Sequence, residues 1–222
     1  MSASTFTEKR FGDIARVIPG YAFKSDDFGN EGFPVVKIAE ITPPRIDLTN
    51  CQRISADKVF GLDRFRLAQN DILIAMTGAT LGKVGRLKED VVAYVNQRVA
   101  KIDSIKGVSD KDFLYYLITG NANNSQIIEI GLGSAQSNFS GGDLEDLQFI
   151  VPDLPTQRRV AAILSSLDDK IEINREINAT LEAIAQAIFK EWFVEFRFPG
   201  AKGEMIESEL GLIPRGWKVG SS

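Results

Sequence analysis

The chain has 222 residues, of which 44% are hydrophobic and 25% charged, so it can bury the core of one domain and carry an additional element. It contains one cysteine and no histidine, which excludes an intramolecular disulfide, a zinc site and every catalytic design that needs a histidine base or ligand. The net charge of −4 is divided unevenly, since residues 1–101 carry 15 Lys and Arg against 12 Asp and Glu, and residues 102–222 carry 11 against 18. The basic half could face phosphates, or the difference could be chance.

Residues 1–154 are predicted to form one α+β domain. Short apolar or β-branched runs alternate irregularly with turn material, which favours α+β over a doubly wound sheet. One helix is expected after Ser109 as its cap, with Asp112 three residues on, and a second over residues 123–130. The predicted strands are Ile14–Ile18, Val35–Ile38, Ile72–Met76, Val91–Val95, Val99–Ile102 and Leu147–Val151.

The character of the sequence changes at Pro155. No Gly and no further Pro occurs before about Phe196, and Pro199-Gly200 ends the run. A helix of about 40 residues would be roughly 60 Å long, too long to bury its apolar face on a domain of this size, so we expect a partner helix. Asn174 and Asn178 interrupt that face, where they could fix the register of a pair or could face solvent. The predicted pairing residues are Val160, Leu164, Leu167, Ile171, Asn174, Ile177, Asn178, Leu181, Ile184, Ile188 and Trp192.

Two segments resemble catalytic motifs without meeting their requirements. Gly78–Lys83 is one residue short of a nucleotide-binding loop, and Val84 stands where a hydroxyl residue would hold magnesium. Asp153 followed by Asp168–Lys170 resembles a metal-dependent nuclease pattern, but the second part falls in the predicted helix and is expected to form a solvated face. We therefore expect no catalytic residue, no metal and no cofactor.

Amide-rich segments are the remaining signal in the predicted domain. They are Thr77–Thr80, Asn96–Arg98 and residues 134–138. Asn, Gln and Arg are the side chains that pair with base edges through two hydrogen bonds, although such loops are also common in proteins that bind no nucleic acid.

At these residues the chain resembles the specificity (S) subunit of type I restriction–modification systems, and the resemblance extends over nearly the whole sequence. Its most specific part is Pro152–Phe193, which contains the segments Pro155–Val160 and Ile173–Asn178. The other matching stretches are Lys9–Ala15, Asp71–Gly85, Asn96–Val99 and Gly133–Gln136.

The resemblance implies three parts. Residues 1–154 would be a target recognition domain, residues 155–198 a long conserved helix for dimerisation and spacing, and residues 199–222 a linker tail like the lead-in to a second recognition domain. Full-length subunits of the family hold two such units whose helices pack antiparallel. This chain has one unit, so we expect a half or truncated subunit that forms a homodimer through the helix.

The partners that the resemblance implies are double-stranded DNA and the methyltransferase (M) and restriction (R) subunits, which would carry the chemistry. A protein-interaction module that binds the M subunit without reading DNA is the alternative. No stretch approaches the ~18 consecutive apolar residues of a membrane span and the N-terminus has no signal-peptide core, so we expect a cytoplasmic protein with no membrane partner.

Contacts to DNA are expected from two sets of side chains in residues 1–154. Phosphates would be contacted by Lys24, Lys37, Lys83 and Arg86. Base edges would be contacted by Thr77, Thr80, Asn96, Gln97, Arg98, Gln136 and Asn138.

Overall fold

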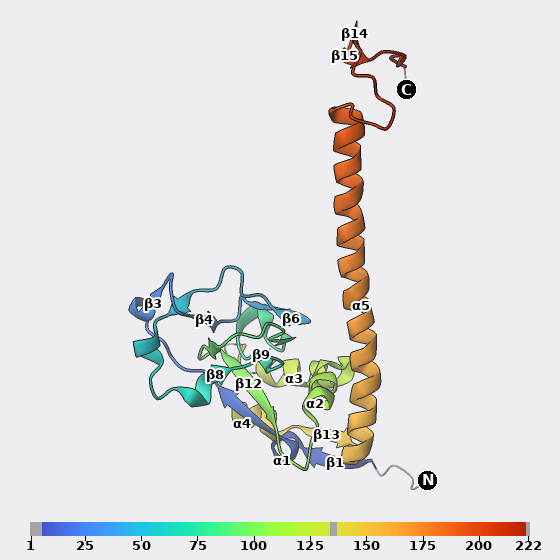
Figure 1. Ribbon diagram of the computed structural model, residues 1–222. Helices are drawn as coiled ribbons and strands as arrows, with labels where there is room; N and C mark the ends of the chain where they lie inside the picture. The colour runs from blue at the N-terminus through green and yellow to red at the C-terminus, as the bar shows by residue number, and fades with distance from the viewer. Residues whose placement is uncertain (1–5, 134–136, 221–222) are drawn as a thin grey trace. The chain divides into compact units, whose positions relative to one another are not determined.

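The computed structural model describes residues 6–133 and 137–220, and the chain divides into two compact units, Met1–Ser165 and Ser166–Ser222 (Figure 1). The first unit contains three β-sheets, of six, five and two strands, several short helices and the beginning of a long helix. The predicted domain boundary at residue 154 therefore falls inside the first unit, because the first turns of the long helix pack on its core. The predicted α+β fold class, with helices and sheets mixed in one domain, and the long helix are confirmed.

A six-stranded sheet lies at the centre of the first unit. Ile72 and Ile74 of its middle strand belong to one core cluster, whereas Leu73 and Ala75 belong to another. Alternate side chains of a strand point to opposite faces, so both faces of this sheet are covered. In spatial order the strands are β2 (Ala15–Pro19), β12 (Val99–Ser104), β9 (Ile72–Ala75), β10 (Val84–Arg86), β6 (Arg45–Ile46) and β5 (Ile41–Thr42).

A second, five-stranded sheet has its own small core. Val35 and Tyr94 pair across two parallel strands and are buried with Phe23, Ile54 and Val59. In spatial order the strands are β3 (Phe28–Gly29), β7 (Arg53–Ile54), β4 (Phe33–Val36), β11 (Ala93–Val95) and β8 (Arg66–Leu67). The 3₁₀ turns around the two sheets are η1 (Ser25–Asp27), η2 (Ala56–Val59), η3 (Asp63–Phe65) and η4 (Gly78–Thr80).

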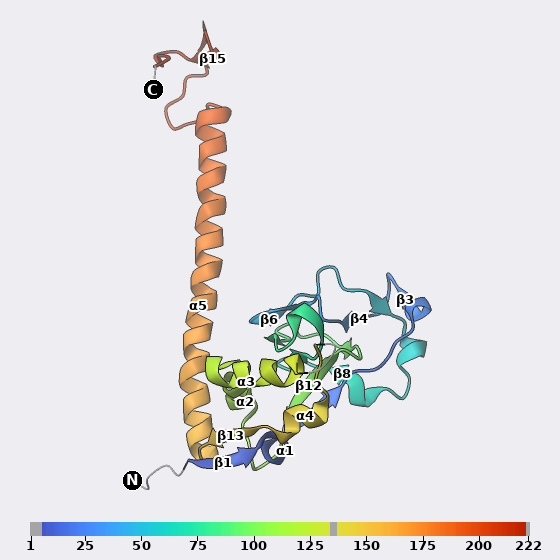
Figure 2. The same ribbon diagram turned by 180° about the vertical axis from the view of Figure 1, so that it is seen from behind.

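Helices cover one side of the six-stranded sheet, and α2 and α3 lie together there in both views (Figures 1 and 2). Leu114, Ile118 and Ile127 are fully buried in the shared core. The helices are α1 (Phe11–Ile14), α2 (Lys111–Thr119), α3 (Asn121–Leu132) and α4 (Gly141–Asp146), and a two-stranded sheet joins β1 (Thr7–Arg10) to β13 (Gln148–Val151).

The cap of α2 differs from the prediction. Asp110, not Ser109, is the N-cap, and its carboxylate accepts the N–H of Phe113 at 3.0 Å. The Ser109 hydroxyl is buried and serves the preceding turn instead, where it donates to the Ile14 carbonyl and accepts the Ile105 N–H. Two adjacent residues could both cap a helix, and tertiary packing decides between them.

The long helix α5 (Leu154–Phe189) has 36 residues and continues into a π-helical turn, η5 (Lys190–Val194). The Asp153 carboxylate accepts the N–H of Thr156 at 3.1 Å, and Pro155 occupies the first turn, where a missing N–H costs nothing. The predicted start at residue 155 is displaced by one residue. No helix in the described part of the chain combines the length and the hydropathy of a membrane-spanning segment.

All six predicted strands are present, with ends displaced by a few residues. The unpredicted strands are two to four residues long, too short to show a period, and include β3, β5, β6, β7, β8 and β10. The second unit adds a hairpin of β14 (Met205–Ser208) and β15 (Gly211–Pro214) after the helix.

Candidate nucleic-acid interface

Three segments that are far apart in the sequence meet at the end of β9. The N–H of Met76 donates to the carbonyl of Arg98 at 3.0 Å, and the N–H of Phe139 donates to the carbonyl of Met76 at 3.1 Å. One residue further on, Thr77 forms an antiparallel bridge with Asn138. The fold therefore brings together the three amide-rich segments found in the sequence.

An aromatic side chain that the sequence analysis missed lies beside these segments. The carbonyl of Tyr21 accepts the N–H of Gln97 at 3.0 Å, and the N–H of Tyr21 donates to Val95 at 2.9 Å. The Tyr21 ring is 39% exposed and packs on Phe23 and Phe65, with centroid distances of 4.9 and 5.4 Å. A single Tyr after a glycine gives no sequence signal, since only strand pairing places it next to Gln97.

The predicted base contacts differ in accessibility. Gln136 lies outside the described residues. The accessible ones, either exposed or half-buried, are Thr77, Thr80, Gln97, Arg98 and Asn138. Their hydroxyl, amide and guanidinium groups offer both donors and acceptors at one end of the sheet.

Asn96 is part of the scaffold rather than of this surface. It is only 9% exposed, its N–H donates to the Val36 carbonyl at 2.9 Å, and its carbonyl accepts the Val99 N–H at 2.9 Å. A Cβ on Gly20 would lie 2.3 Å from the Asn96 carbonyl oxygen, so only glycine fits at position 20, beside Asn96. The prediction of a base contact is not supported for Asn96, because its position between β11 and β12 buries it.

Lys83 lies in the turn that joins β9 to β10. The turn needs glycine at residue 82, where φ is +78° and a Cβ would lie 2.6 Å from the Ile128 side chain of α3. The Lys83 N–H donates to the Thr80 carbonyl at 3.0 Å, and its side chain is exposed. Gly82 thus shapes the turn and its packing, and the exposed Lys83 side chain is a cation that can meet a phosphate.

Lys24 and Lys37 flank strands of the second sheet. Lys24 is exposed and precedes η1. The ammonium nitrogen of Lys37 lies 3.7 Å from the centroid of the Phe28 ring and donates to the Gln52 side chain. A cation–π contact and a hydrogen bond therefore already hold Lys37, which weakens the case for it as a phosphate contact.

Arg86 does not lie at the surface, and the expectation of a phosphate contact is wrong in this structure. The residue is 5% exposed, with Nη1 3.1 Å from the Asp112 carboxylate and Nη2 3.2 Å from the Asp112 carbonyl. Its guanidinium carbon lies 3.9 Å from the Tyr115 ring centroid and 5.2 Å from that of Tyr116. A planar, weakly hydrated guanidinium suits such a buried stacked position, so Arg86 links β10 to α2.

The predicted pairing face of α5 is partly used by the first unit. Val160 packs against the main core and Leu164 is half-buried, so the first unit already occupies part of the predicted pairing face at these two residues. From residue 167 onward the apolar residues of this face are exposed, with Leu181 at 58%. Steps of four and three residues connect Leu167, Ile171, Asn174, Asn178, Leu181, Ala185, Ile188 and Trp192. That spacing is the heptad pattern of a coiled coil.

Further apolar residues widen this face. Ile177 and Ile184 are each 50% exposed and lie beside the heptad positions. Ile173, which the sequence analysis left out, is 54% exposed and lines a shallow depression with Ile177, Leu181 and the polar residues between them. The exposed apolar stripe is therefore wide enough to pack against another helix.

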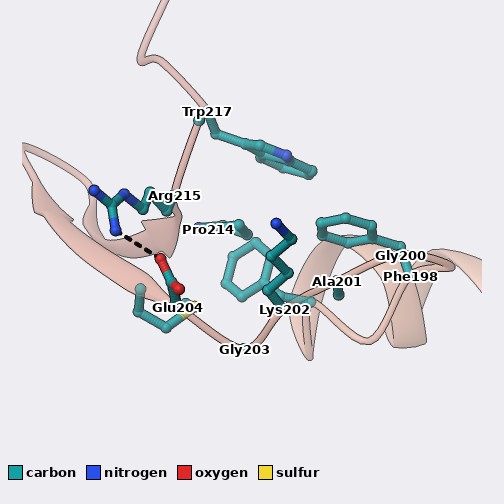
Figure 3. Close-up of a pocket in the computed structure, with 12 residues that line it drawn as sticks. Phe198, Gly200, Ala201, Lys202, Gly203, Glu204, Pro214, Arg215 and Trp217 are labelled. Atoms are coloured by element: carbon teal, nitrogen blue, oxygen red, sulfur yellow. Dashed lines mark hydrogen bonds and ion pairs between the residues drawn. The ribbon is translucent and has the colours of Figure 1, made fainter.

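The end of the second unit contains a pocket of about 580 Å³ in which no predicted site residue lies (Figure 3). Trp217 stacks on Phe198 with ring centroids 5.7 Å apart, and Arg215 pairs with Glu204 at 2.7 Å. The pocket forms because the loop after η5 folds back against the β14–β15 hairpin, and its aromatic wall is satisfied by contacts among its own rings.

Nucleophilic and metal chemistry have little to build on in the described parts of the chain. The Cys51 Sγ lies 3.0 Å from the Leu48 carbonyl, and burial raises the pKa of this thiol, which lowers its thiolate fraction. Within residues 6–133 and 137–220, no group of three or more Cys, Asp or Glu side chains is placed to hold a metal ion.

Comparison with known proteins gives a consistent family. The sequence profile described as "Type I restriction modification DNA specificity domain" matches residues 3–183. The specificity subunit of the type I restriction enzyme HindI from Haemophilus influenzae is 28% identical over 213 residues, which are 94% of this chain and 45% of that protein. The MjaIX specificity subunit from Methanocaldococcus jannaschii is 30% identical over 156 residues, covering 69% of this chain and 35% of that protein.

Two solved structures share the fold. The HsdS subunit from Thermoanaerobacter tengcongensis superposes with a TM-score of 0.56 at 18% identity, over 85% of this chain and 44% of that one. The S subunit from M. genitalium superposes with a TM-score of 0.56 at 18% identity, over 88% of this chain and 50% of that one. The chain thus spans half or less of the length of these relatives.

Proposed function

The chain belongs to the type I restriction–modification DNA specificity family, and from this premise we propose that it reads one half of a two-part DNA site and catalyses no reaction itself. The observation that carries the proposal is the convergence of three sequence segments into one accessible group of hydroxyl, amide and guanidinium side chains, next to an exposed lysine. Proteins read DNA sequence with such side chains at base edges and set their position with cations at phosphates.

The reading surface consists of side chains at the end of β9. Gln97 and Arg98 lie between β11 and β12, and Arg98 is bonded through its carbonyl to Met76. Backbone hydrogen bonds to Tyr21 and Met76 fix the main chain of these two residues, so the loop itself needs little ordering when their side chains bind a base. The proposed base contacts are Thr77, Thr80, Gln97, Arg98 and Asn138, together with Gln136 from outside the described residues, and the proposed phosphate contacts are Lys83 and Lys24.

Two copies of the chain provide the two halves of the reader. The exposed heptad face of α5 needs a partner, and a second copy of the same helix, packed antiparallel, covers it. The resulting two-fold axis relates two identical recognition domains, so the DNA site is an interrupted palindrome. The paired helices then set the distance between its halves, and Asn174 and Asn178 at heptad positions fix their register.

The partners of the dimer supply the chemistry. We propose that the helices dock methyltransferase (M) subunits, and through them restriction (R) subunits, in the cytoplasm. Methylation and ATP-driven cleavage then belong to those subunits, in agreement with the absence of histidine from the chain.

The test is capture of the M subunit followed by DNA binding. The chain is mixed with the M subunit of its own system, and the captured complex is presented with randomised duplex DNA. Enrichment of a split sequence supports the proposal. Capture of the M subunit without any enriched sequence contradicts DNA reading and indicates an interaction module, and failure to capture the M subunit contradicts the proposed assembly.

A further inference from the structure

A buried glutamine connects the first turn of α5 to the recognition domain. Gln157 is only 1% exposed, although glutamine on a helix is usually solvated. Its Oε1 accepts the backbone N–H of Asp110 at 3.0 Å, and its Nε2 donates to the Pro152 carbonyl at 3.0 Å and lies 3.4 Å from that of Val108. A buried amide is costly unless its groups are paired, and here each end of the amide has a partner.

The same face of α5 continues the contact over two more turns. Ala161, four residues after Gln157, is 3% exposed, and its small side chain lets the helix backbone approach the core. Four residues further on, the Ser165 hydroxyl lies 3.3 Å from the Tyr116 hydroxyl of α2. Residues four apart lie on one helix face, so a single strip of α5 is held against α2 and the turn before it.

The helix α2 is in turn fixed to the recognition sheet. Arg86 at the end of β10 bonds to Asp112 and stacks on Tyr115 and Tyr116, as described above. Lys111 of α2 forms an ion pair with Asp71, which precedes β9. Because β9 and β10 carry the turn with Lys83 between them, a continuous set of bonded and stacked groups connects that turn to the first turns of α5.

We propose that Gln157 and Arg86 are positioning residues that hold the first turns of α5 in one direction and one register relative to the recognition turn, and so determine which spacer length the dimer accepts. The proposal rests on the proposed function. Hydrogen bonds and a planar stack fix direction, whereas an apolar contact alone tolerates sliding.

The size of the effect follows from helix and DNA geometry. A slip of one helix residue moves the domain by about 1.5 Å along α5, and the same slip in both copies changes their separation by about 3 Å. One base pair of DNA rises by about 3.4 Å. A loose joint would therefore let the dimer accept a neighbouring spacer length without any change in the bases that it reads.

The experiment compares the wild-type chain with Gln157→Leu and Arg158→Leu, each in complex with the M subunit, in selection from duplexes randomised in sequence and in spacer length. Gln157→Leu keeps the side-chain volume but leaves the Asp110 N–H and the Pro152 carbonyl unpaired, whereas Arg158 is exposed and serves as the matched control. We expect Gln157→Leu to select the wild-type half-sites over at least two adjacent spacer lengths, and Arg158→Leu to select the wild-type spacer alone.

A second variant keeps the test decisive if Gln157→Leu does not fold. Arg86→Lys retains the charge but loses the stack and the fork of donors, and it is expected to broaden the spacer preference in the same way. If the wild-type chain selects a split site and every folded variant keeps its single spacer length, the inference is overturned and the proposed function stands. If the wild-type chain selects no split site, the proposed function fails instead.

Discussion

Leu181→Asp on the exposed face of α5 is expected to dissociate the proposed homodimer. Leu181 lies at a heptad position and is 58% exposed in the single chain. Full burial of a Leu side chain contributes about 1.5–3 kcal/mol, so covering its exposed part contributes roughly 1–1.5 kcal/mol in each copy. Two copies lose about 2–3 kcal/mol together, which weakens dimerisation roughly 30- to 150-fold. The carboxylate adds a desolvation penalty, so this is a lower bound.

Sedimentation velocity over a series of concentrations measures this effect. Gln186→Asp introduces the same charge at an exposed position away from the heptad face, so it is the matched control. We expect wild type and Gln186→Asp to sediment as dimers at micromolar concentration and Leu181→Asp as a monomer with an unchanged melting temperature of the recognition domain. A wild-type chain that stays monomeric, or a Leu181→Asp variant that dimerises as well as the control, would refute the assignment of this face.

Three further predictions concern the recognition domain. Lys83→Ala should weaken binding to all duplexes and lower the slope of log K against log salt by about one for each copy bound, whereas an unchanged slope would remove Lys83 from the interface. Arg86→Met should lower the free energy of unfolding by about 2 kcal/mol, since it removes two charge-assisted hydrogen bonds while the half-exposed Asp112 can be hydrated instead. Chemical denaturation measures this change, and a change below about 0.5 kcal/mol would contradict the prediction. The backbone N–H and hydroxyl of Ser140 lower the pKa of Asp143 below its ordinary 3.8, so the stability that the charge of Asp143 provides is present above pH 3.8 and lost as the pH falls through the folded-state pKa. The difference in thermal stability between wild type and Asp143→Asn should therefore shrink from pH 5 to pH 3, and a constant difference would contradict this.

The sequence alone predicted the elements whose signals are long or strongly apolar. α5 follows from some 40 residues without Gly or Pro and from a repeated apolar spacing, and both signals are local. β9 and β12 follow from runs that are buried on both faces of the sheet. The short strands of the second sheet exist only because they pair with neighbours, and pairing cannot be read from two residues.

The candidate site was predictable by residue type but not by exposure. Gln97 and Asn96 are adjacent amides, yet Gln97 is exposed and Asn96 is buried between two strands. The charge of Arg86 suggested a phosphate contact, but Asp112 pairs with it and the Tyr115 and Tyr116 rings of α2 stack on it. Val160 fits the helix period as well as Leu167 does, and only the packing of the first unit separates the two.

Selection from a fully randomised duplex library, with the M subunit present, decides whether two copies of this chain read a two-part DNA site. We expect enrichment of one interrupted palindrome with a fixed spacer, and loss of that enrichment when Gln97 and Arg98 are both changed to Ala. Enrichment of a single uninterrupted half-site would contradict the two-fold dimer, and recovery of unselected DNA would contradict sequence reading by this chain.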